Sequence, residues 1–499
     1  MADYDVIVIG AGCGGVSSGA ILAHQGRKVL LLEQGGNIGG CCSTFEKEGY
    51  HFDVGASVVE EIQPLEIAFE MLGTRFQSEV ELIPCDPMMS FIYYDGSRVT
   101  YPISIEGTGE VISRISPEDG QSWFRFAKYF GGMTETIMKG FLVSPATGMA
   151  DMMRLLVKTP ELMKYAPLFV MSYQDVIKKY FKSEAVQRTM SYQSLYLGLP
   201  PELVAGLFAL LPYSEHEGIW YPRGGMIQIP AAFVRCGEKA GLEVRTKARV
   251  VQVVVRRGRV EGVVLEDGSE ITAPVVVSNI NAKTLYLDLI GEADLPWLAR
   301  VGMKSYEYSK SVPMVYVGLD YEPPLEAHHS AIAVSPDEMS DYWYNNAMKG
   351  VLPDREFGLI CWPTKSDPGL APEGHHVLNL IPEGFYELAG TDWDEQKEPF
   401  LERTIEYLSS FAIPGLADHV VVSDCATPLD FERRLLLPKG AIYDLQQDIV
   451  SQTVFRPSAR SRSVKGLYLV GNSTHPGGGV PTTTASGIIA ATLINKYES

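Results

Sequence analysis

Residues 5–15 read DVIVIGAGCGG, and this stretch decides the fold of the N-terminal part of the chain. A short apolar run, Asp5–Ile9, is followed at once by spaced glycines and then by an apolar-periodic stretch that ends at Gly26. A second apolar run, Lys28–Leu32, ends next to Glu33, eighteen residues after the last of the spaced glycines. Strand, glycine turn, helix and strand in this order predict a βαβ unit that binds a dinucleotide.

Each part of this unit has a physical role in dinucleotide binding. Gly10 permits a tight turn, and Gly15 lets the helix pack close to the strand. Gly12, with Gly14 beside it, lets backbone N–H groups approach a pyrophosphate at the positive end of the helix. Glu33 is placed to accept hydrogen bonds from a ribose 2′-hydroxyl, which favours an unphosphorylated adenosine ribose.

Two further stretches separate FAD from NAD as the dinucleotide. Gly39 and Gly40 follow the acid, and residues 50–57 then read YHFDVGAS. Together with the βαβ unit they resemble the extended N-terminal motif of the FAD flavoenzymes related to glutathione reductase, in the subgroup that holds amine oxidases, protoporphyrinogen oxidase, phytoene desaturases and carotenoid isomerases. This resemblance implies FAD as the cofactor. It places Gly39 and Gly40 beneath the ribityl chain, with Gly55 and Ala56 in the same site.

Residues 221–280 return to strand and turn signals and predict a β-meander inserted into the nucleotide-binding domain. We expect strands near Glu243–Thr246, Val250–Arg256, Val260–Glu266 and Ile271–Ser278. Val250 is a candidate backbone contact of the adenine, and an ordinary core valine is an equally good interpretation. The runs YPRGGM at 221–226 and SLYLGLPP at 194–201 resemble the phytoene desaturase and carotenoid isomerase branch, and the second run is closer to the desaturases.

Residues 467–481 read LYLVGNSTHPGGGVP and form the most specific motif of the chain. A buried strand, a glycine-rich turn and a helix that begins near Thr482 would aim backbone N–H groups at an anionic group or at the flavin. The run resembles the C-terminal signature of phytoene desaturase-like enzymes. That resemblance implies cofactor contacts from Gly471, Asn472, Gly479, Val480, Pro481 and Thr482. Many relatives in the wider group carry an acid at the position of Asn472, whose amide still offers an acceptor and donors.

Together these motifs predict an α/β protein of two domains, with the architecture of amine oxidases and phytoene desaturases. The FAD-binding Rossmann domain, of the glutathione reductase type with a β-meander insertion, is expected to comprise residues 1–58, 221–305 and 425–499. A mixed α+β substrate-binding or cap domain is expected from residues 59–220 and 306–424. A length of 499 residues is enough for more than one core.

The amino-acid composition indicates which partners and which cellular compartment to expect. A formal net charge of −19 disfavours binding to nucleic acid, whose binders concentrate Lys and Arg. Seven cysteines without a CxxC pair, in a chain too long to need disulfide staples, indicate reduced thiols. The N-terminal residues lack the basic start and cleavage site of a signal peptide. We therefore expect a cytoplasmic protein, and peripheral contact with the inner face of the cell membrane is a hypothesis.

Residues 138–190 combine positive charge with apolar side chains. This window holds eight Lys or Arg against four Asp or Glu, and seven of the 17 methionines. Methionine suits the lining of an irregular apolar pocket, and basic residues beside apolar ones suit a surface that lies on anionic lipid. The window therefore favours monotopic membrane contact. A helical cap with methionines in its core and solvated lysines is the alternative.

The resemblance implies FAD-dependent desaturation of phytoene or a related long isoprenoid polyene, with a hydride passing to flavin N5. The sequence holds no second glycine fingerprint for a nicotinamide cofactor, which favours oxygen or a quinone as the electron acceptor. Three alternatives stay open. They are a carotenoid cis–trans isomerase or retinol-saturase-like reductase on the same fold, an amine oxidase on a soluble substrate, and a flavin-binding scaffold without turnover.

The sequence assigns no catalytic residue, although it offers candidates. The polar groups expected near the flavin are His51, Asp53, Arg223 and His475, with Glu215, His216 and Glu217 at the pocket wall. Histidines and arginines in such motifs more often fix loops or flavin oxygens than react. Cys41–Cys42 is interpreted as a packing pair, because adjacent cysteines rarely form a disulfide. The pairs His328–His329 and His375–His376 lack partners at ligand spacing, so no metal is expected.

Overall fold

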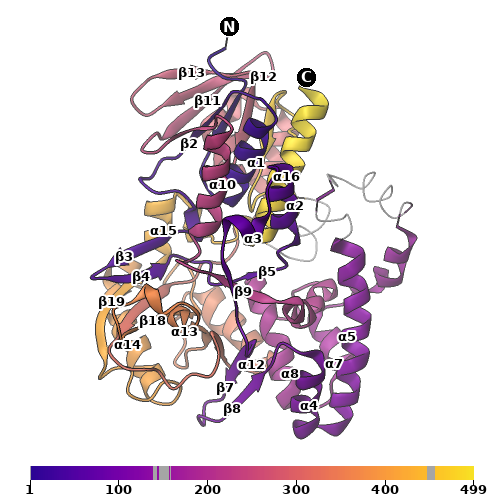
Figure 1. Cartoon of the computed structure of the whole chain (residues 1–499), viewed down its shortest axis with the longest axis vertical. Helices are drawn as coiled ribbons and strands as arrows, with labels where there is room; N and C mark the ends of the chain where they lie inside the picture. Colours follow the sequence, from indigo (N-terminus) through magenta and orange to yellow (C-terminus); the bar gives the residue numbers. More distant parts are fainter. Residues whose placement is uncertain (1, 139–142, 145–156, 158, 447–455, 499) are drawn as a thin grey trace.

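The computed structural model describes residues 2–138, 143–144, 157, 159–446 and 456–498. Within these residues the chain forms one half with a parallel sheet, which contains both chain ends and is called the nucleotide-binding half after the prediction above, and a second half with a larger sheet and a layer of helices (Figure 1). The predicted α/β class is confirmed. Of the window at 138–190, residues 139–142, 145–156 and 158 lie outside the described part of the chain.

The sheet of the nucleotide-binding half is assembled from three distant segments. Its order is β10–β2–β1–β14–β20, with β1 at Val6–Ile9, β2 at Val29–Leu32, β10 at Glu243–Arg245, β14 at Val275–Ser278 and β20 at Leu467–Leu469. Every pairing in this sheet is parallel. Strands β1, β2, β14 and β20 are buried along their whole length, which explains why they read as unbroken apolar runs.

Small residues let three helices pack closely beside this sheet. Helix α1 (Cys13–His24) contacts both α10 (Gln228–Lys239) and α16 (Val480–Tyr497) (Figure 1). A Cβ on Gly487 of α16 would lie 2.1 Å from Oγ of Ser17 on α1, so the contact requires glycine. Helix α16 therefore brings the C-terminal motif against the first helix of the chain.

The expectation of one strand over Ile271–Ser278 is wrong. The chain instead forms β13 (Glu270–Thr272) and then β14 of the parallel sheet. β13 completes an antiparallel meander with β11 (Val250–Arg256) and β12 (Arg259–Leu265). Pro274 has no N–H to donate to a ladder, so the two strands are separated there.

A seven-stranded sheet forms the core of the second half. Its order is β19–β15–β18–β17–β16–β7–β8, with β7 at Met89–Ile92, β8 at Arg98–Tyr101, β15 at Met314–Leu319, β16 at His329–Ile332, β17 at Gly358–Cys361, β18 at His376–Pro382 and β19 at Val420–Ala426. Among its described strands, only the β16–β7 pairing is parallel. Residues 425–426, expected in the FAD-binding domain, are the last two residues of β19. The two-domain division stays a prediction.

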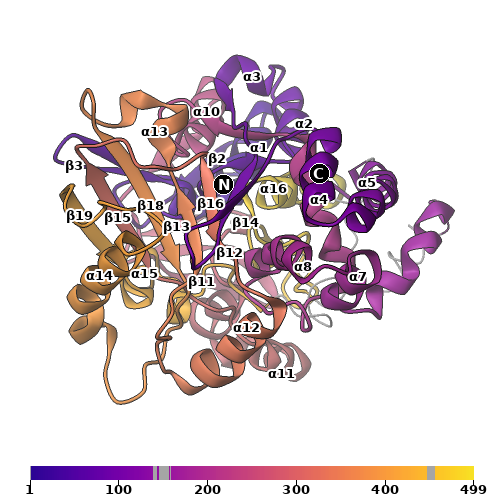
Figure 2. The ribbon, with the colours of Figure 1, turned by 90° about the horizontal axis from the view of Figure 1, so that it is seen from below.

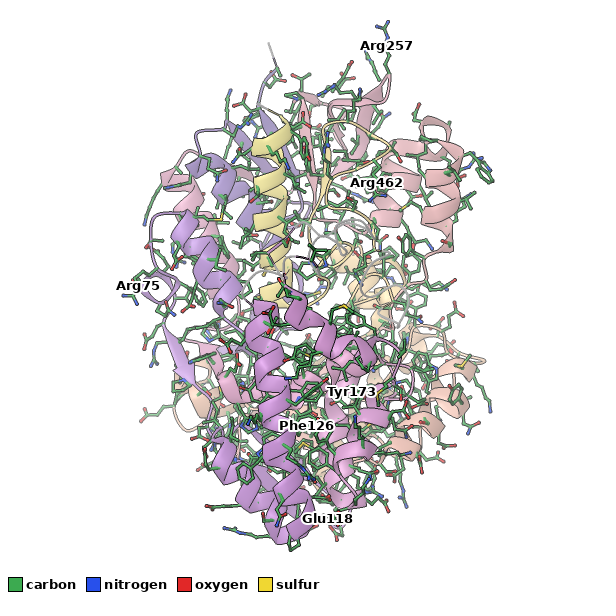
Figure 3. The ribbon with its side chains drawn as sticks, turned by 90° about the vertical axis from the view of Figure 1, so that its right-hand side faces the viewer. Arg75, Glu118, Phe126, Tyr173, Arg257 and Arg462 are labelled. Carbon is green, nitrogen blue, oxygen red and sulfur yellow. The ribbon has the colours of Figure 1, made fainter. Side chains whose placement is uncertain are left out.

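Helices form a separate layer on one side of this larger sheet, as Figure 2 shows for α4 (Ile105–Ile115), α7 (Tyr173–Tyr180) and α8 (Glu184–Ser191). Helix α5 (Pro117–Met138) is the longest described helix of the layer, and it buries Trp123, Phe126 and Phe130 completely. Their spacing of three and four residues places them on one face of the helix. Phe126 and Tyr173 lie between the helices in Figure 3.

A short three-stranded sheet joins the two halves. β9 (Ile219–Pro222) pairs with β5 (Val59–Glu60) on one side and with β6 (Leu82–Pro84) on the other. In Figure 1, β5 and β9 lie between the nucleotide-binding half and the helical layer. The described helices include none that is both long and apolar enough to cross a membrane.

Candidate active site

The glycine turns from the two ends of the chain meet. A Cβ on Gly14 would lie 2.7 Å from the backbone N of Gly471, closer than two such atoms can approach. A Cβ on Gly15 would lie 2.0 Å from the carbonyl O of Gly10, so Gly15 allows α1 to begin directly after the turn. Gly10 has a φ of +92°, a conformation that glycine adopts without strain. The turns are therefore built for close backbone approach.

A cavity of about 700 Å³ extends from these turns into the second half of the molecule. Its wall includes the predicted cofactor residues Gly10, Gly12, Gly14, Glu33, Gly39, Gly40, Gly55, Ala56, Val250, Gly471, Asn472, Gly479, Val480, Pro481 and Thr482. Gly15 lies behind the wall, in the packing role described above. The tertiary structure thus brings residues 10–14, 33–40, 55–56, 250 and 471–482 to one cavity.

Glu33 ties the first turn to the second strand. One carboxylate oxygen accepts a 2.9 Å hydrogen bond from the N–H of Ala11, and the other accepts a 2.7 Å bond from the N–H of Gly35. The N–H of Ala248 donates to the Glu33 carbonyl, which places the start of β11 beside this end of the cavity. Val250 shares that wall. A ribose contact from Glu33 and an adenine contact from Val250 stay predictions.

The C-terminal turn is held by polar contacts that the motif did not reveal. Asn472 Nδ2 donates a 3.0 Å hydrogen bond to the carbonyl of Ile442. Close by, the buried carboxylate of Asp444 lines the cavity and accepts hydrogen bonds from Asn281 and Ser473. Burial raises the pKa of Asp444 to about 6. Sequence reasoning missed Asp444, because it lies outside every motif and a positive φ of 68° is its one local peculiarity.

The candidate catalytic residues separate into different environments. His475 is buried and lines the cavity. His51 lies in the hairpin strand β4 (Tyr50–Asp53), opposite Glu46 of β3 (Thr44–Lys47). Arg223 is exposed, and its Nε is 2.8 Å from Oε1 of Glu81. Neither His51 nor Arg223 is part of the cavity wall formed by the described residues.

Asp53, expected among the polar groups near the flavin, is not part of the cavity wall formed by the described residues, and its buried carboxylate joins separate segments of the chain. Its carboxylate accepts hydrogen bonds from Thr44 Oγ1 at 2.7 Å, from the Tyr221 hydroxyl at 2.6 Å and from the Met226 N–H at 2.9 Å. Burial nevertheless raises the pKa of Asp53 to about 6, because desolvation outweighs these bonds. Asp53 thereby holds the hairpin against the 221–226 segment.

One arm of the cavity is apolar and contains acids that sequence reasoning missed. Its wall includes Thr134, Tyr196, Leu197, Leu207, Phe208, Leu210 and Leu211. Glu60 and Glu61 also face the cavity, and Glu215 lies fully buried behind Tyr196. His216 Nδ1 donates a 2.7 Å hydrogen bond to the carbonyl oxygen of Ile103, and Glu217 is exposed. Neither residue is part of the cavity wall formed by the described residues, although both were expected there.

Three cysteines line the cavity near the first turn. They are Cys13, Cys41 and Cys42. Burial raises the pKa of Cys41 to about 12, and a hydrogen bond with Cys13 together with burial raises the pKa of Cys42. The raised pKa values of Cys41 and Cys42 disfavour their thiolate forms, which fits the interpretation of Cys41–Cys42 as a packing pair.

The cavity has the features that a flavin dinucleotide requires. Helices α1 and α16 both begin at its wall, so the positive ends of both helices point to one region. A Cβ on Gly12 would lie 2.6 Å from Nδ2 of Asn279, so glycine at this position leaves room for the Asn279 side chain, which also lines the cavity. The protein-family model described as "flavin containing amine oxidoreductase" matches residues 14–495 of the chain. The chain belongs to this family. The prediction of an FAD-dependent oxidoreductase is therefore confirmed.

Individual relatives in this family cover nearly the whole chain. A zeta-carotene-forming phytoene desaturase from Myxococcus xanthus is 27% identical over 495 residues, which are 98% of this chain and 93% of that protein. A lycopene-forming phytoene desaturase from Pantoea ananas is 28% identical over 496 residues, 98% of each chain. Among solved structures, cyclohexylamine oxidase from Brevibacterium oxydans IH-35A has a TM-score of 0.60 at 16% identity, covers all of both chains and supports the fold alone.

Proposed function

We propose that the chain catalyses FAD-dependent desaturation of phytoene or a related long isoprenoid polyene. The observation that carries the proposal is the continuity of one cavity, which runs from the glycine turns into an arm lined by Leu207, Phe208, Leu210 and Leu211. Such an arm suits a hydrocarbon chain, because apolar area removed from water is favourable by about 25 cal/mol per Å². The two relatives described above are phytoene desaturases, which supports this choice of substrate.

Different parts of the cavity wall would contact the cofactor and the substrate. The turns around Gly12 and Gly471, with the N-termini of α1 and α16, would hold the pyrophosphate and ribityl parts of FAD. Glu33 and Val250 would face its adenosine end. When bound, oxidised FAD supplies a hydride acceptor. The leucine-lined arm orients the polyene and excludes water from the reacting carbons.

Expression in cells that accumulate phytoene, followed by mass analysis of the pigments, tests the proposal. A desaturase converts phytoene to products that are lighter by two hydrogens per new double bond. Anaerobic incubation distinguishes the rivals, because a desaturase bleaches oxidised flavin, whereas an isomerase requires reduced flavin and returns product of unchanged mass. Turnover of amines without lipid would instead indicate an amine oxidase. If no tested substrate alters the absorbance of the bound flavin, the protein is a flavin-binding scaffold without turnover.

We also propose that the substrate is taken from a membrane surface and that oxygen or a quinone reoxidises the flavin. Phe169 and Val170 are 41% and 87% exposed, and Met163 is 58% exposed beside Lys164. Apolar side chains with an adjacent lysine suit the interface of an anionic bilayer. Sedimentation with anionic liposomes at low salt tests the contact. Reoxidation rates with oxygen and with a soluble quinone identify the acceptor.

A further inference from the structure

Two acidic side chains face the apolar arm of the cavity. Glu60 and Glu61 share this wall with Leu210 and Leu211. Ser214, at the end of α9 (Leu211–Ser214), hydrogen-bonds to the Glu61 carboxyl group, so the acid lies beside these leucines. Ionisation of a carboxyl group in such a place costs free energy, because desolvation opposes the charged form.

The sheet that joins the two halves brings a third acid to this place. Glu60 of β5 pairs with Ile219 of β9, and Glu215 lies only a short turn before that strand. Glu215 accepts hydrogen bonds of 3.2 Å from Gln193 Nε2 and from the Tyr196 hydroxyl. The other amide atom of Gln193, Oε1, is buried and has no hydrogen-bond partner among the described residues. The acids therefore adjoin a polar group whose hydrogen-bonding capacity is unused.

Burial and mutual repulsion both oppose the ionisation of these carboxyl groups. Burial raises the pKa of Glu60 well above its ordinary value, and the neighbouring Glu215 and Glu61 raise it further. Burial, and then the charge of Glu217, raises the pKa of Glu61 to about 7, against the hydrogen bond from Ser214. A base is most effective when its pKa is close to the working pH.

We propose that Glu61 accepts the proton that the substrate loses on desaturation; this inference rests on the proposed function. One C–H bond breaks with its electron pair, and the hydride passes to oxidised flavin. On the adjacent carbon the proton passes to the Glu61 carboxylate, and the electron pair left behind forms the new C=C bond. Glu217 is exposed to solvent and interacts electrostatically with Glu61, so it is a positioning residue that tunes Glu61.

The test compares FAD-loaded wild type with Glu61→Gln, Glu217→Gln and a matched control, Glu70→Gln, an exposed acid on α2 (Gln63–Met71). Phytoene is supplied in phosphatidylglycerol vesicles without oxygen, and flavin bleaching is followed across pH. The wild-type rate is expected to rise with pH through an apparent pKa near 7. Glu61→Gln should lower the rate roughly 100- to 10,000-fold and flatten this profile. Glu217→Gln should move the midpoint to lower pH, and Glu70→Gln should change neither.

Infrared titration of carboxylic acid carbonyl bands gives a readout that needs no turnover. Glu61→Gln should lose one carboxyl group that titrates near pH 7, while its flavin absorbance shows that the protein is folded and loaded. Wild-type kinetics and pH profile in a flavin-loaded Glu61→Gln protein would overturn the role of Glu61 while leaving the proposed function intact. A wild-type protein that leaves phytoene unchanged would reject the proposed function itself, and this role with it.

Discussion

Gly14 and Gly471, from opposite ends of the chain, are so close that a Cβ on Gly14 would lie 2.7 Å from the backbone N of Gly471. The contact joins the first glycine turn to the last one, and both turns line the cavity. Because neither backbone can move away without opening the turn that it belongs to, this approach ties the geometry of the cofactor site to glycine at position 14.

Gly14→Ala is therefore expected to weaken FAD binding. Forced overpacking costs about 1–3 kcal/mol, which corresponds to a loss of affinity of about 5- to 150-fold. The measurement is fluorescence titration of the flavin-free protein with FAD. Gly302→Ala is the control, because a Cβ there meets nothing within 4 Å. Unchanged FAD affinity in Gly14→Ala would show that the two turns do not close on the cofactor.

Phe126→Ala should destabilise the helical layer by about 3–5 kcal/mol, because Phe126 is fully buried and its removal leaves a cavity. Phe124→Ala, two residues earlier on the same helix, removes a ring that is 46% exposed and should cost much less. Chemical denaturation of both variants measures the difference in the free energy of unfolding. Equal losses would contradict the packing of α5 (Figure 3).

Asp444 should make the stability of the flavin-free protein depend on pH. Burial raises the pKa of Asp444 from 3.8 to about 6, so the folded state binds more protons than the unfolded state between these values. The contribution of Asp444 to the free energy of unfolding is fully present below pH 3.8 and is lost as the pH rises through about 6. Asp444→Asn removes this pH dependence, which amounts to at most about 3 kcal/mol in the free energy of unfolding. Free energies of unfolding measured at pH 5 and 7 should therefore differ less in the variant than in the wild type.

Val170→Asp should reduce sedimentation with anionic liposomes by about tenfold or more, because a charge replaces a side chain that is 87% exposed in the proposed contact. Leu298→Asp makes the same kind of change on α11 (Trp297–Ser305), where Leu298 is 76% exposed. This control should bind as the wild type does. An equal loss in both variants would mean that the 159–170 segment has no special part in membrane contact.

Motifs whose parts are close in sequence could be read directly. The strand, glycine turn and helix at residues 5–26 follow from neighbouring residues, and β11 begins and ends where its pattern predicts, at Val250 and Arg256. The expectation of one strand over Ile271–Ser278 was wrong, because the run is divided at Pro274 and its two parts belong to different sheets. Periodicity shows that a run is extended, but it does not show which sheet receives it.

The sequence by itself predicted a dinucleotide site, since glycines at 10, 12 and 15 impose a backbone geometry through local sterics alone. Tertiary structure alone decided that Glu60, Glu61 and Asp444 face the cavity. Their ionisation depends on desolvation and on charges from distant segments, as the interaction of Glu60 with Glu215 shows. Burial is a property of the packed chain, so no local pattern of residues contains it.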